Sequence, residues 1–340
     1  EKLVPTYEDA MTQLRLLARN ATSQRITSYT TFIQGPTPGH EQHIVLVDNG
    51  RRKMHELPEF RDALHCIRCA ACANVCPPYR EVGGHVFGHV YTGAIGLVVT
   101  PFLHSLEDIA GPQSLCLSCN ACEVVCPVDI PLPRQILDVR DMVVQQQGMK
   151  RAKRMILSAY SKPSIANMLL KIGSKLQKPL VRKGGFIRMR KASIINKQTS
   201  WRSFPSLADP HLAERVEPNI PARQHIENRA TGMTVALFPG CMTDRMYPEQ
   251  GAATLKVLSA MGVSVLNPTD LHCCGLIPFN SGDVPNAKSL ALHTLGRLES
   301  LEVDAILSPS ASCVAMMAQD YLHLFRNDPD VLPRAENLAA

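Results

Sequence analysis

Residues 66–77 read CIRCAACANVCP, and residues 116–127 read CLSCNACEVVCP. Both stretches follow the spacing C-x2-C-x2-C-x3-C-P, and together they contain eight of the twelve cysteines of the chain. Three cysteines at this interval can converge on one bound group, and the proline ends the turn because it has no backbone N–H to donate. The chain therefore repeats a cysteine-rich loop, and we expect the fold around it to be organised by this repeat.

The repeated spacing is that of bacterial ferredoxins with two [4Fe–4S] clusters, in which the fourth cysteine of each run binds the cluster of the other run. Two ligand sets follow from this crossed arrangement: Cys66, Cys69, Cys72 and Cys126 for the first cluster, and Cys76, Cys116, Cys119 and Cys122 for the second. We therefore expect an electron carrier with a helical, ferredoxin-type domain.

Zinc and disulfides are the alternatives to these clusters. Structural zinc takes four ligands, usually from two separated C-x2-C pairs, so the third cysteine and the C-P step have no role in a zinc site. The cysteines within each run are too close for disulfides, and the start of the chain has no signal peptide. The cysteines thus indicate a reducing, cytoplasmic location.

The length of 340 residues favours two or three domains. The sequence starts without methionine and ends in a stretch that favours helix, so we expect a fragment of a longer polypeptide. The expected parts are the end of an upstream α/β domain (1–50), the two-cluster domain (51–148), a basic helical segment with a linker (149–230) and a truncated cysteine-rich domain (231–340).

A basic block lies between the two cysteine-rich regions. Residues 150–202 contain fifteen Lys or Arg and no Asp or Glu, which leaves the rest of the chain with an excess of acids. Apolar residues at positions 165, 168, 169, 172 and 176 have helical spacing within it. We expect either a helix that docks on an anionic membrane or a partner, or an ordinary amphipathic helix with a solvated basic face. Nucleic acid is not an expected partner, because Tyr160 and Trp201 give little aromatic interleaving and no recognised module is present.

Outside the cysteine runs, the residue pattern predicts helices over 8–17, 57–64 and 131–147, with strand-like runs over 26–33 and 43–47. Residues 209–229 are predicted to be a linker. The rest alternates between strand and helix, with strands over 233–238, 263–266 and 305–307 and helices over 250–261, 285–298 and 314–325. This alternation is typical of a parallel sheet covered by helices. The fold class expected for the whole chain is α+β and multidomain.

The four remaining cysteines follow the three strands of this predicted sheet. Cys241 follows the first strand, Cys273 and Cys274 the second, and Cys313 the third. Ligands of open α/β sheets gather at the carboxyl ends of strands, so we expect a shared metal or redox site. The alternative is that these cysteines are small buried hydrophobic residues.

These residues also carry a resemblance. Cys241, the triplet Cys273–Cys274–Gly275 and Cys313 resemble the cysteine-rich CCG domain of heterodisulfide reductase B subunits. The resemblance implies a third iron–sulfur cluster, cubane or non-cubane. That family commonly ends in C-x2-C, whereas this chain has Met316 at the last position, which argues against a five-cysteine centre.

A closer resemblance is to the lactate-utilisation iron–sulfur proteins. It rests on the stretches KLVPT (2–6), VDNGR (47–51), CIRC (66–69), CCG (273–275), FNSG (279–282) and SASC (310–313). Residues 1–210 are similar to the LutB subunit of that family and residues 231–340 to its LutA subunit, so the chain looks like a fusion of the two.

The resemblance implies an electron-transfer component of a membrane-associated system that oxidises lactate to pyruvate and feeds the respiratory chain. Redox proteins or subunits are the implied partners, with a quinone pool as acceptor and a peripheral position on the inner face of the cytoplasmic membrane. No catalytic residue is assigned, because the chain has no flavin or nicotinamide motif. A heterodisulfide reductase- or glycolate oxidase-type oxidoreductase, and a non-catalytic redox sensor or scaffold, remain open.

Overall fold

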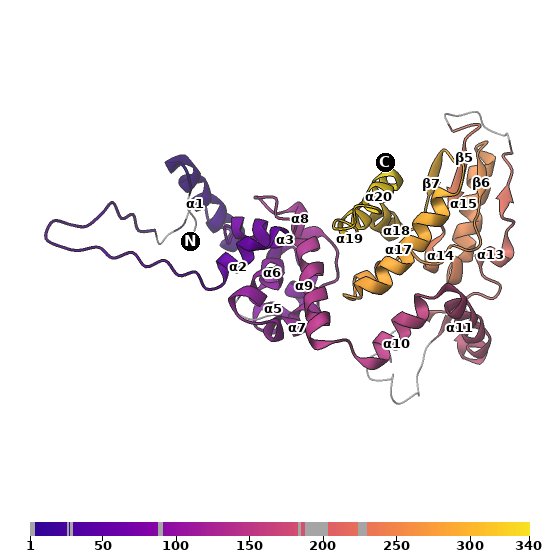
Figure 1. The fold of residues 1–340 in the computed structure, drawn as a ribbon, viewed down its shortest axis with the longest axis horizontal. Coiled ribbons are helices and arrows are strands. Elements are labelled where there is room, and N and C mark those ends of the chain that lie inside the picture. Colours follow the sequence, from indigo (N-terminus) through magenta and orange to yellow (C-terminus); the bar gives the residue numbers. More distant parts are fainter. Residues whose placement is uncertain are drawn as a thin grey trace. The chain divides into compact units, whose positions relative to one another are not determined.

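The structure is a computed structural model that describes residues 4–25, 27, 30–87, 91–182, 185–187, 203–223 and 230–340. It divides into two compact units, the first helical in its described residues and the second built from helices and sheets (Figure 1). The first unit is Glu1–Gly148 with Asn280–Gly282, and the second is Met149–Phe279 with Asp283–Ala340.

Helices are the only regular elements among the described residues of the first unit. They are α1 (Tyr7–Thr22), α2 (Arg51–Glu56), α3 (Pro58–Arg61), the 3-10 helix η1 (Asp62–His65), α4 (Ala71–Asn74), α5 (Pro77–Phe87), α6 (Gly93–Leu103), α7 (Leu106–Gln113), α8 (Ala121–Val124) and α9 (Leu132–Gln147). The predicted helices over 8–17 and 131–147 match α1 and α9, and the one over 57–64 is a pair of short turns, α3 and η1.

Helix α6 is the centre of this unit and packs against α4, α7 and α9. Its sequence is almost wholly apolar, and the residues from Gly93 to Thr100 are all buried. Gly93 has a φ of +76° and allows close approach to α4, since a Cβ there would lie 2.6 Å from the Cβ of Ala73. The burial of α6 therefore fixes the backbone on which the first cysteine run rests.

The two strands predicted near the N-terminus are wrong for the residues that the structure describes. Residues 30–33 and 43–47 have no regular structure, while Ile26, Ser28 and Tyr29 lie outside the described residues. The side chains of Ile44, Val45, Leu46 and Val47 are between 72% and 90% exposed. Strand preference depends on pairing and on a face to bury, and the described residues offer this segment neither.

The second unit mixes helices and sheets. Its helices are α10 (Arg151–Tyr160), α11 (Pro163–Leu176), η2 (Lys178–Leu180), α13 (Leu212–Arg215), α14 (Gly240–Arg245), α15 (Pro248–Ala260), α16 (Leu276–Phe279), α17 (Val284–Glu299), α18 (Ala311–Ala315), the π-helix η3 (Met316–Asp320), α19 (Tyr321–Leu324) and α20 (Leu332–Ala339). Its strands are β1 (Val181–Arg182), β2 (Phe186–Ile187), β3 (Phe204–Pro205), β4 (Asn219–Ile220), β5 (Thr234–Leu237), β6 (Ser264–Leu266) and β7 (Ala305–Leu307).

The main sheet of the second unit has the strand order β4-β6-β5-β7. Strands β6, β5 and β7 are parallel, as predicted, with Val235 of β5 opposite Val265 and Ala305. The prediction of a wholly parallel sheet is nevertheless wrong, because β4 pairs with β6 in the antiparallel direction. The predicted linker over 209–229 is also partly wrong, since it contains α13 and β4. Parallel sheets often carry such an antiparallel edge strand.

The core of this sheet is made by Val235, Leu237, Leu255, Val263 and Val265, all of which are buried. The order of strands and helices places the carboxyl ends of β5, β6 and β7 at one edge. Among the described helices, none has the length and apolar character needed to cross a membrane.

Candidate metal centres

The two cysteine runs of the first unit meet around two cavities, and each cavity takes thiols from both runs. One cavity is lined by Cys66, Cys69, Cys72 and Cys126. The other is lined by Cys76, Cys116, Cys119 and Cys122. These groups are the two ligand sets expected from the crossed arrangement.

Helix α6 lines both cavities. Its Ile95 lines the first cavity, whereas Ala94 and Leu97 line the second. The Cys122 thiol interacts electrostatically with Cys72 as well as with Cys116 and Cys119, so the two cavities are neighbours. The apolar α6 thus forms part of the wall of both thiol groups, which lie close together.

The backbone repeats along with the sequence. Arg68 and Ser118, at matching positions of the two runs, have φ values of +63° and +53°. Their N–H groups donate to the sulfurs of Cys66 and Cys116, at 3.4 and 3.5 Å. Ala70 and Asn120 are also left-handed, with φ of +59° and +60°. Each loop therefore turns backbone donors toward its own cysteine sulfurs.

Burial opposes charge on some of these thiols, although Cys119 is exposed. Burial raises the pKa of Cys72 to about 11 and that of Cys122 to about 12. Thiolates at these positions therefore need positive groups nearby. Arg140 of α9 supplies one charge near the second cavity, since its guanidinium donates to the carbonyls of Gln113 at 2.9 Å and Cys116 at 3.2 Å. Iron would supply the rest, because metal ligation requires thiolates.

The donor set fits iron–sulfur clusters better than a single metal ion. No group of three or more His, Cys, Asp or Glu side chains is arranged to hold one ion in the part of the chain that the structure describes. A zinc ion needs its four sulfurs about 2.3 Å from one point. The thiols instead surround cavities, with all-sulfur donors and apolar walls, as a multi-iron group requires.

The four cysteines of the second unit also come together, at the carboxyl ends of the parallel strands. Cys241 lies in α14 after β5, Cys273 and Cys274 follow β6, and Cys313 lies in α18 after β7. Their thiols form a hydrogen-bonded row in the order Cys241, Cys273, Cys274, Cys313. The strand ends therefore bring together residues that are far apart in the sequence.

The thiols in this row alternate in acidity. Hydrogen bonds to their neighbours raise the pKa of Cys241 and Cys274. Hydrogen bonds from these two thiols lower the pKa of Cys273 and Cys313. Donor and acceptor thiols thus alternate along the row.

Two glycines allow this packing. Gly240 has a φ of +70°, and a Cβ at this position would lie 2.9 Å from the Cys313 sulfur. Gly275 has a φ of +94°, and its N–H donates to the Cys273 sulfur at 3.4 Å. The predicted helix over 314–325 is observed as a helical run through α18, η3 and α19 that ends at Leu324, and Met316 of the π-helix η3 is fully buried.

Several residues around this third site were not expected from the sequence. The hydroxyl of Tyr160, in α10, forms hydrogen bonds with the thiols of Cys241 and Cys273. The buried hydroxyl of Tyr321 donates to the carbonyl of Cys274 at 2.8 Å. Ser310 and Ser312 form hydrogen bonds with Cys313. Only the serines had a signal in the sequence, because they are neighbours of the cysteine.

Three family profiles match the chain. They are a LUD domain over residues 1–55, a 4Fe-4S dicluster domain over 62–130 and a cysteine-rich CCG domain over 235–318. The last two matches contain the three thiol groups described above, and they support iron–sulfur clusters as the bound groups.

Curated relatives include proteins named Lactate utilization protein B. Those of Anoxybacillus flavithermus and Bacillus thuringiensis are 39% and 42% identical over 183 residues, or 52% of this chain. That of Macrococcus caseolyticus is 35% identical over 231 residues, or 65% of this chain. The resemblance to lactate-utilisation iron–sulfur proteins is confirmed.

The lactate-utilisation relatives are longer than the stretch they share with this chain. The alignments cover 39%, 38% and 48% of the proteins from A. flavithermus, B. thuringiensis and M. caseolyticus. No solved structure gives a significant match. The CCG match lies outside the 4Fe-4S match, which is consistent with a chain that joins LutB-like and LutA-like parts.

Proposed function

We propose that this chain is the iron–sulfur electron-transfer component of a system that oxidises lactate to pyruvate and passes the electrons to the respiratory chain. The observation that carries the proposal is the assembly of twelve cysteines into three thiol groups, two in the first unit and one in the second. The substrate is taken from the lactate-utilisation relatives.

The chain's own residues would bind, insulate and tune three clusters. When bound, the clusters supply one-electron transfer. With crossed ligation, both clusters of the first unit would lie against α6, whose apolar side chains line the two cavities. Backbone N–H groups of Arg68 and Ser118 stabilise negative charge on cysteine sulfur. Hydrogen bonding and burial of this kind set reduction potentials.

The chemical step is assigned to another domain or partner, since none of the three sites contains an obvious acid–base pair. The heterodisulfide reductase- and glycolate oxidase-type alternatives use similar cluster modules and differ in substrate. A redox sensor or scaffold would hold the clusters but would not oxidise or reduce a substrate.

The test compares cells that produce the protein with cells in which Cys72→Ala replaces the chromosomal copy. Oxidation of lactate, glycolate and a disulfide substrate is measured in extracts that retain membranes. The proposal predicts that Cys72→Ala abolishes lactate-dependent reduction of the respiratory acceptor and leaves glycolate oxidation unchanged. Loss of glycolate oxidation alone would contradict it, and unchanged turnover of every substrate would favour the sensor.

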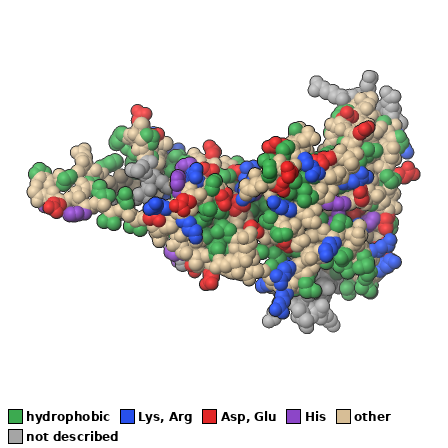
Figure 2. Space-filling model, in the orientation of Figure 1, with side chains coloured by type: hydrophobic (Ala, Val, Ile, Leu, Met, Phe, Trp, Pro, Cys, Tyr) green, Lys and Arg blue, Asp and Glu red, His purple; other side chains and the backbone are tan. Residues whose placement is uncertain are grey.

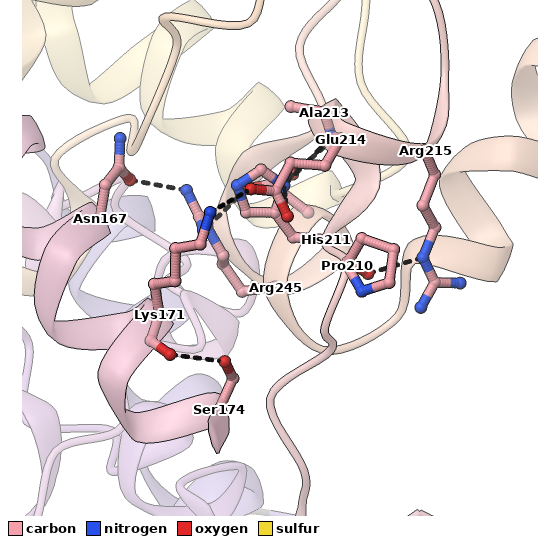
Figure 3. Close-up of polar contacts among 10 residues, drawn as sticks. Asn167, Lys171, Ser174, Pro210, His211, Ala213, Glu214, Arg215 and Arg245 are labelled. Atoms are coloured by element: carbon pink, nitrogen blue, oxygen red, sulfur yellow. Dashed lines mark hydrogen bonds and ion pairs between the residues drawn. The ribbon is translucent and has the colours of Figure 1, made fainter. Parts of the chain in front are cut away.

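A second part of the proposal concerns an anionic membrane surface, and α11 supports it. Five apolar side chains of this helix are between 38% and 72% exposed: Ile165, Met168, Leu169, Ile172 and Leu176. The opposite face is attached to its own unit. There Ala166 and Ser174 are buried, Asn167 accepts from Arg245 at 2.6 Å, and Lys171 donates to Glu214 at 2.9 Å (Figure 3).

The charge around the exposed face favours an anionic lipid surface over a neutral protein surface. Lys171 and Lys178 pair with Glu214 and Asp209, while α10 and α11 carry further basic residues and no acid. Figure 2 shows green and blue side chains gathered on the same face of the lower part of the second unit. An exposed apolar stripe flanked by lysines is the pattern of a helix that lies in the membrane interface.

A further inference from the structure

Helix α10 brings a tyrosine into the third thiol group. Tyr160 is the last residue of α10, and its hydroxyl forms hydrogen bonds with the thiols of Cys241 and Cys273. These cysteines follow different strands, β5 and β6. The hydroxyl therefore bridges two strand ends that would contribute to one cluster.

Contacts of Tyr160 itself and of the residue that follows it fix the position of Tyr160. His272, which directly precedes Cys273, contacts the Tyr160 carbonyl oxygen through Nε2 at 3.1 Å. The two rings also lie against each other, with centroids 4.8 Å apart. The next residue, Ser161, is buried and donates from its hydroxyl to the carbonyl of Leu157 at 2.8 Å, which secures the end of α10.

The third thiol group differs from the other two in the kind of donor that its sulfurs receive. Among the described residues, the hydrogen-bond donors to the ferredoxin-type sulfurs are backbone N–H groups, as at Arg68 and Ser118. The sulfurs of the second unit receive side-chain hydroxyls in addition to the backbone N–H of Gly275, from Tyr160 at one end of the row and from Ser310 and Ser312 at the other. A hydroxyl can be removed by substitution while the backbone stays in place.

We propose that Tyr160 is a positioning residue of the third centre, whose single hydroxyl proton is shared between the thiolates of Cys241 and Cys273 and raises the reduction potential of the cluster they hold. This inference rests on the proposed function, because it requires a cluster at these cysteines. One-electron reduction adds a negative charge that is shared with the thiolate ligands. A hydrogen bond to those sulfurs stabilises the reduced state more than the oxidised state.

The test is Tyr160→Phe in the full, cluster-loaded chain, studied by EPR-monitored redox titration. Phenylalanine keeps the ring against His272 and the backbone carbonyl that His272 contacts, so only the hydroxyl is lost. We expect the third cluster's midpoint to move to more negative potential by roughly tenfold in the reduction equilibrium, or ~59 mV for a one-electron couple. The two ferredoxin-type clusters should keep their midpoints.

Tyr247→Phe is the matched control, because this half-buried tyrosine belongs to the same unit and should leave all three midpoints unchanged. Selective loss of the third cluster in Tyr160→Phe, with an unchanged circular dichroism spectrum, would also support the inference. An intact third cluster with an unshifted midpoint would overturn it and leave the proposed function standing. A wild-type chain with no third cluster would overturn both.

Discussion

Cys126, from the second cysteine run, lines the same cavity as Cys72, from the first, and the two thiols interact electrostatically. The two runs are therefore not independent loops with one cluster each. If ligation is crossed in this way, a substitution in one run affects the cluster that is held mainly by the other.

Cys126→Ala tests this crossing directly. We expect loss of the cluster held by Cys66, Cys69 and Cys72, and retention of the cluster held by Cys116, Cys119 and Cys122. EPR of the reduced protein reports each signal separately. Cys122→Ala is the matched control, because it lies in the same run and should damage the other cluster. The same signal disappearing in both variants would refute the crossed assignment.

Ala70→Gly tests the backbone of the first loop. Ala70 has a φ of +59°, a conformation that costs a residue with a Cβ about 1 kcal/mol. Glycine adopts it freely, so we expect the cluster-loaded first unit to unfold at a higher temperature, measured by loss of visible absorbance.

Ala71→Gly is the control for this change. Ala71 is the first residue of α4 and helical, and glycine in a helix costs roughly 0.5–1 kcal/mol. The two neighbouring substitutions should therefore shift the midpoint in opposite directions. A lower midpoint for both would mean that the left-handed turn stores no strain.

Tyr321→Phe tests the packing beneath the third thiol group. The Tyr321 hydroxyl donates to the carbonyl of Cys274 at 2.8 Å, and the tyrosine is fully buried. Removing the hydroxyl leaves the buried carbonyl of Cys274 without this donor, which lowers the free energy of unfolding by about 1–3 kcal/mol. Urea unfolding of the second unit, followed by circular dichroism, should show the loss. A midpoint equal to that of the wild type would show that another donor replaces the hydroxyl.

The exposed face of α11 predicts binding to anionic vesicles. The double variant Ile172→Ser, Leu176→Ser should co-sediment several-fold less with vesicles that contain phosphatidylglycerol, because it removes apolar area that enters the interface. Val257→Ser, which removes an exposed apolar residue on α15, should bind like the wild type.

Salt and lipid composition provide the second arm of this experiment. Binding of the wild type should weaken at moderate salt, since lysines attract anionic lipid over a short screened range. Equal binding to phosphatidylcholine vesicles, or no effect of the double substitution, would contradict a membrane role for this helix.

The sequence predicted the three thiol groups because their signals are local. Each cysteine run carries its own spacing, and Cys241, Cys273 and Cys313 each follow a strand whose apolar pattern is clear. Strand β7 occupies the predicted residues 305–307. The local residue pattern was sufficient to predict an element wherever that element is both regular and buried.

The incorrect or missing predictions concern elements and contacts that depend on residues distant in the sequence. The run from Ile44 to Val47 has strong strand preference and no strand, because no described neighbour pairs with it. Strand β4 is only two residues long and forms through pairing with β6, so residue pattern could not reveal it. Tyr160 reaches the third site from a helix in the basic segment, and nothing in its surrounding sequence indicates this contact.

The most direct test of the account is anaerobic quantification of iron and acid-labile sulfide in the reconstituted chain, combined with EPR. Three four-iron clusters require about twelve irons and twelve sulfides per chain. We predict this content, with a decrease to about eight in Cys274→Ser and with the signals of the first unit preserved. A wild-type content of about eight, unchanged by Cys274→Ser, would contradict a cluster at the CCG cysteines.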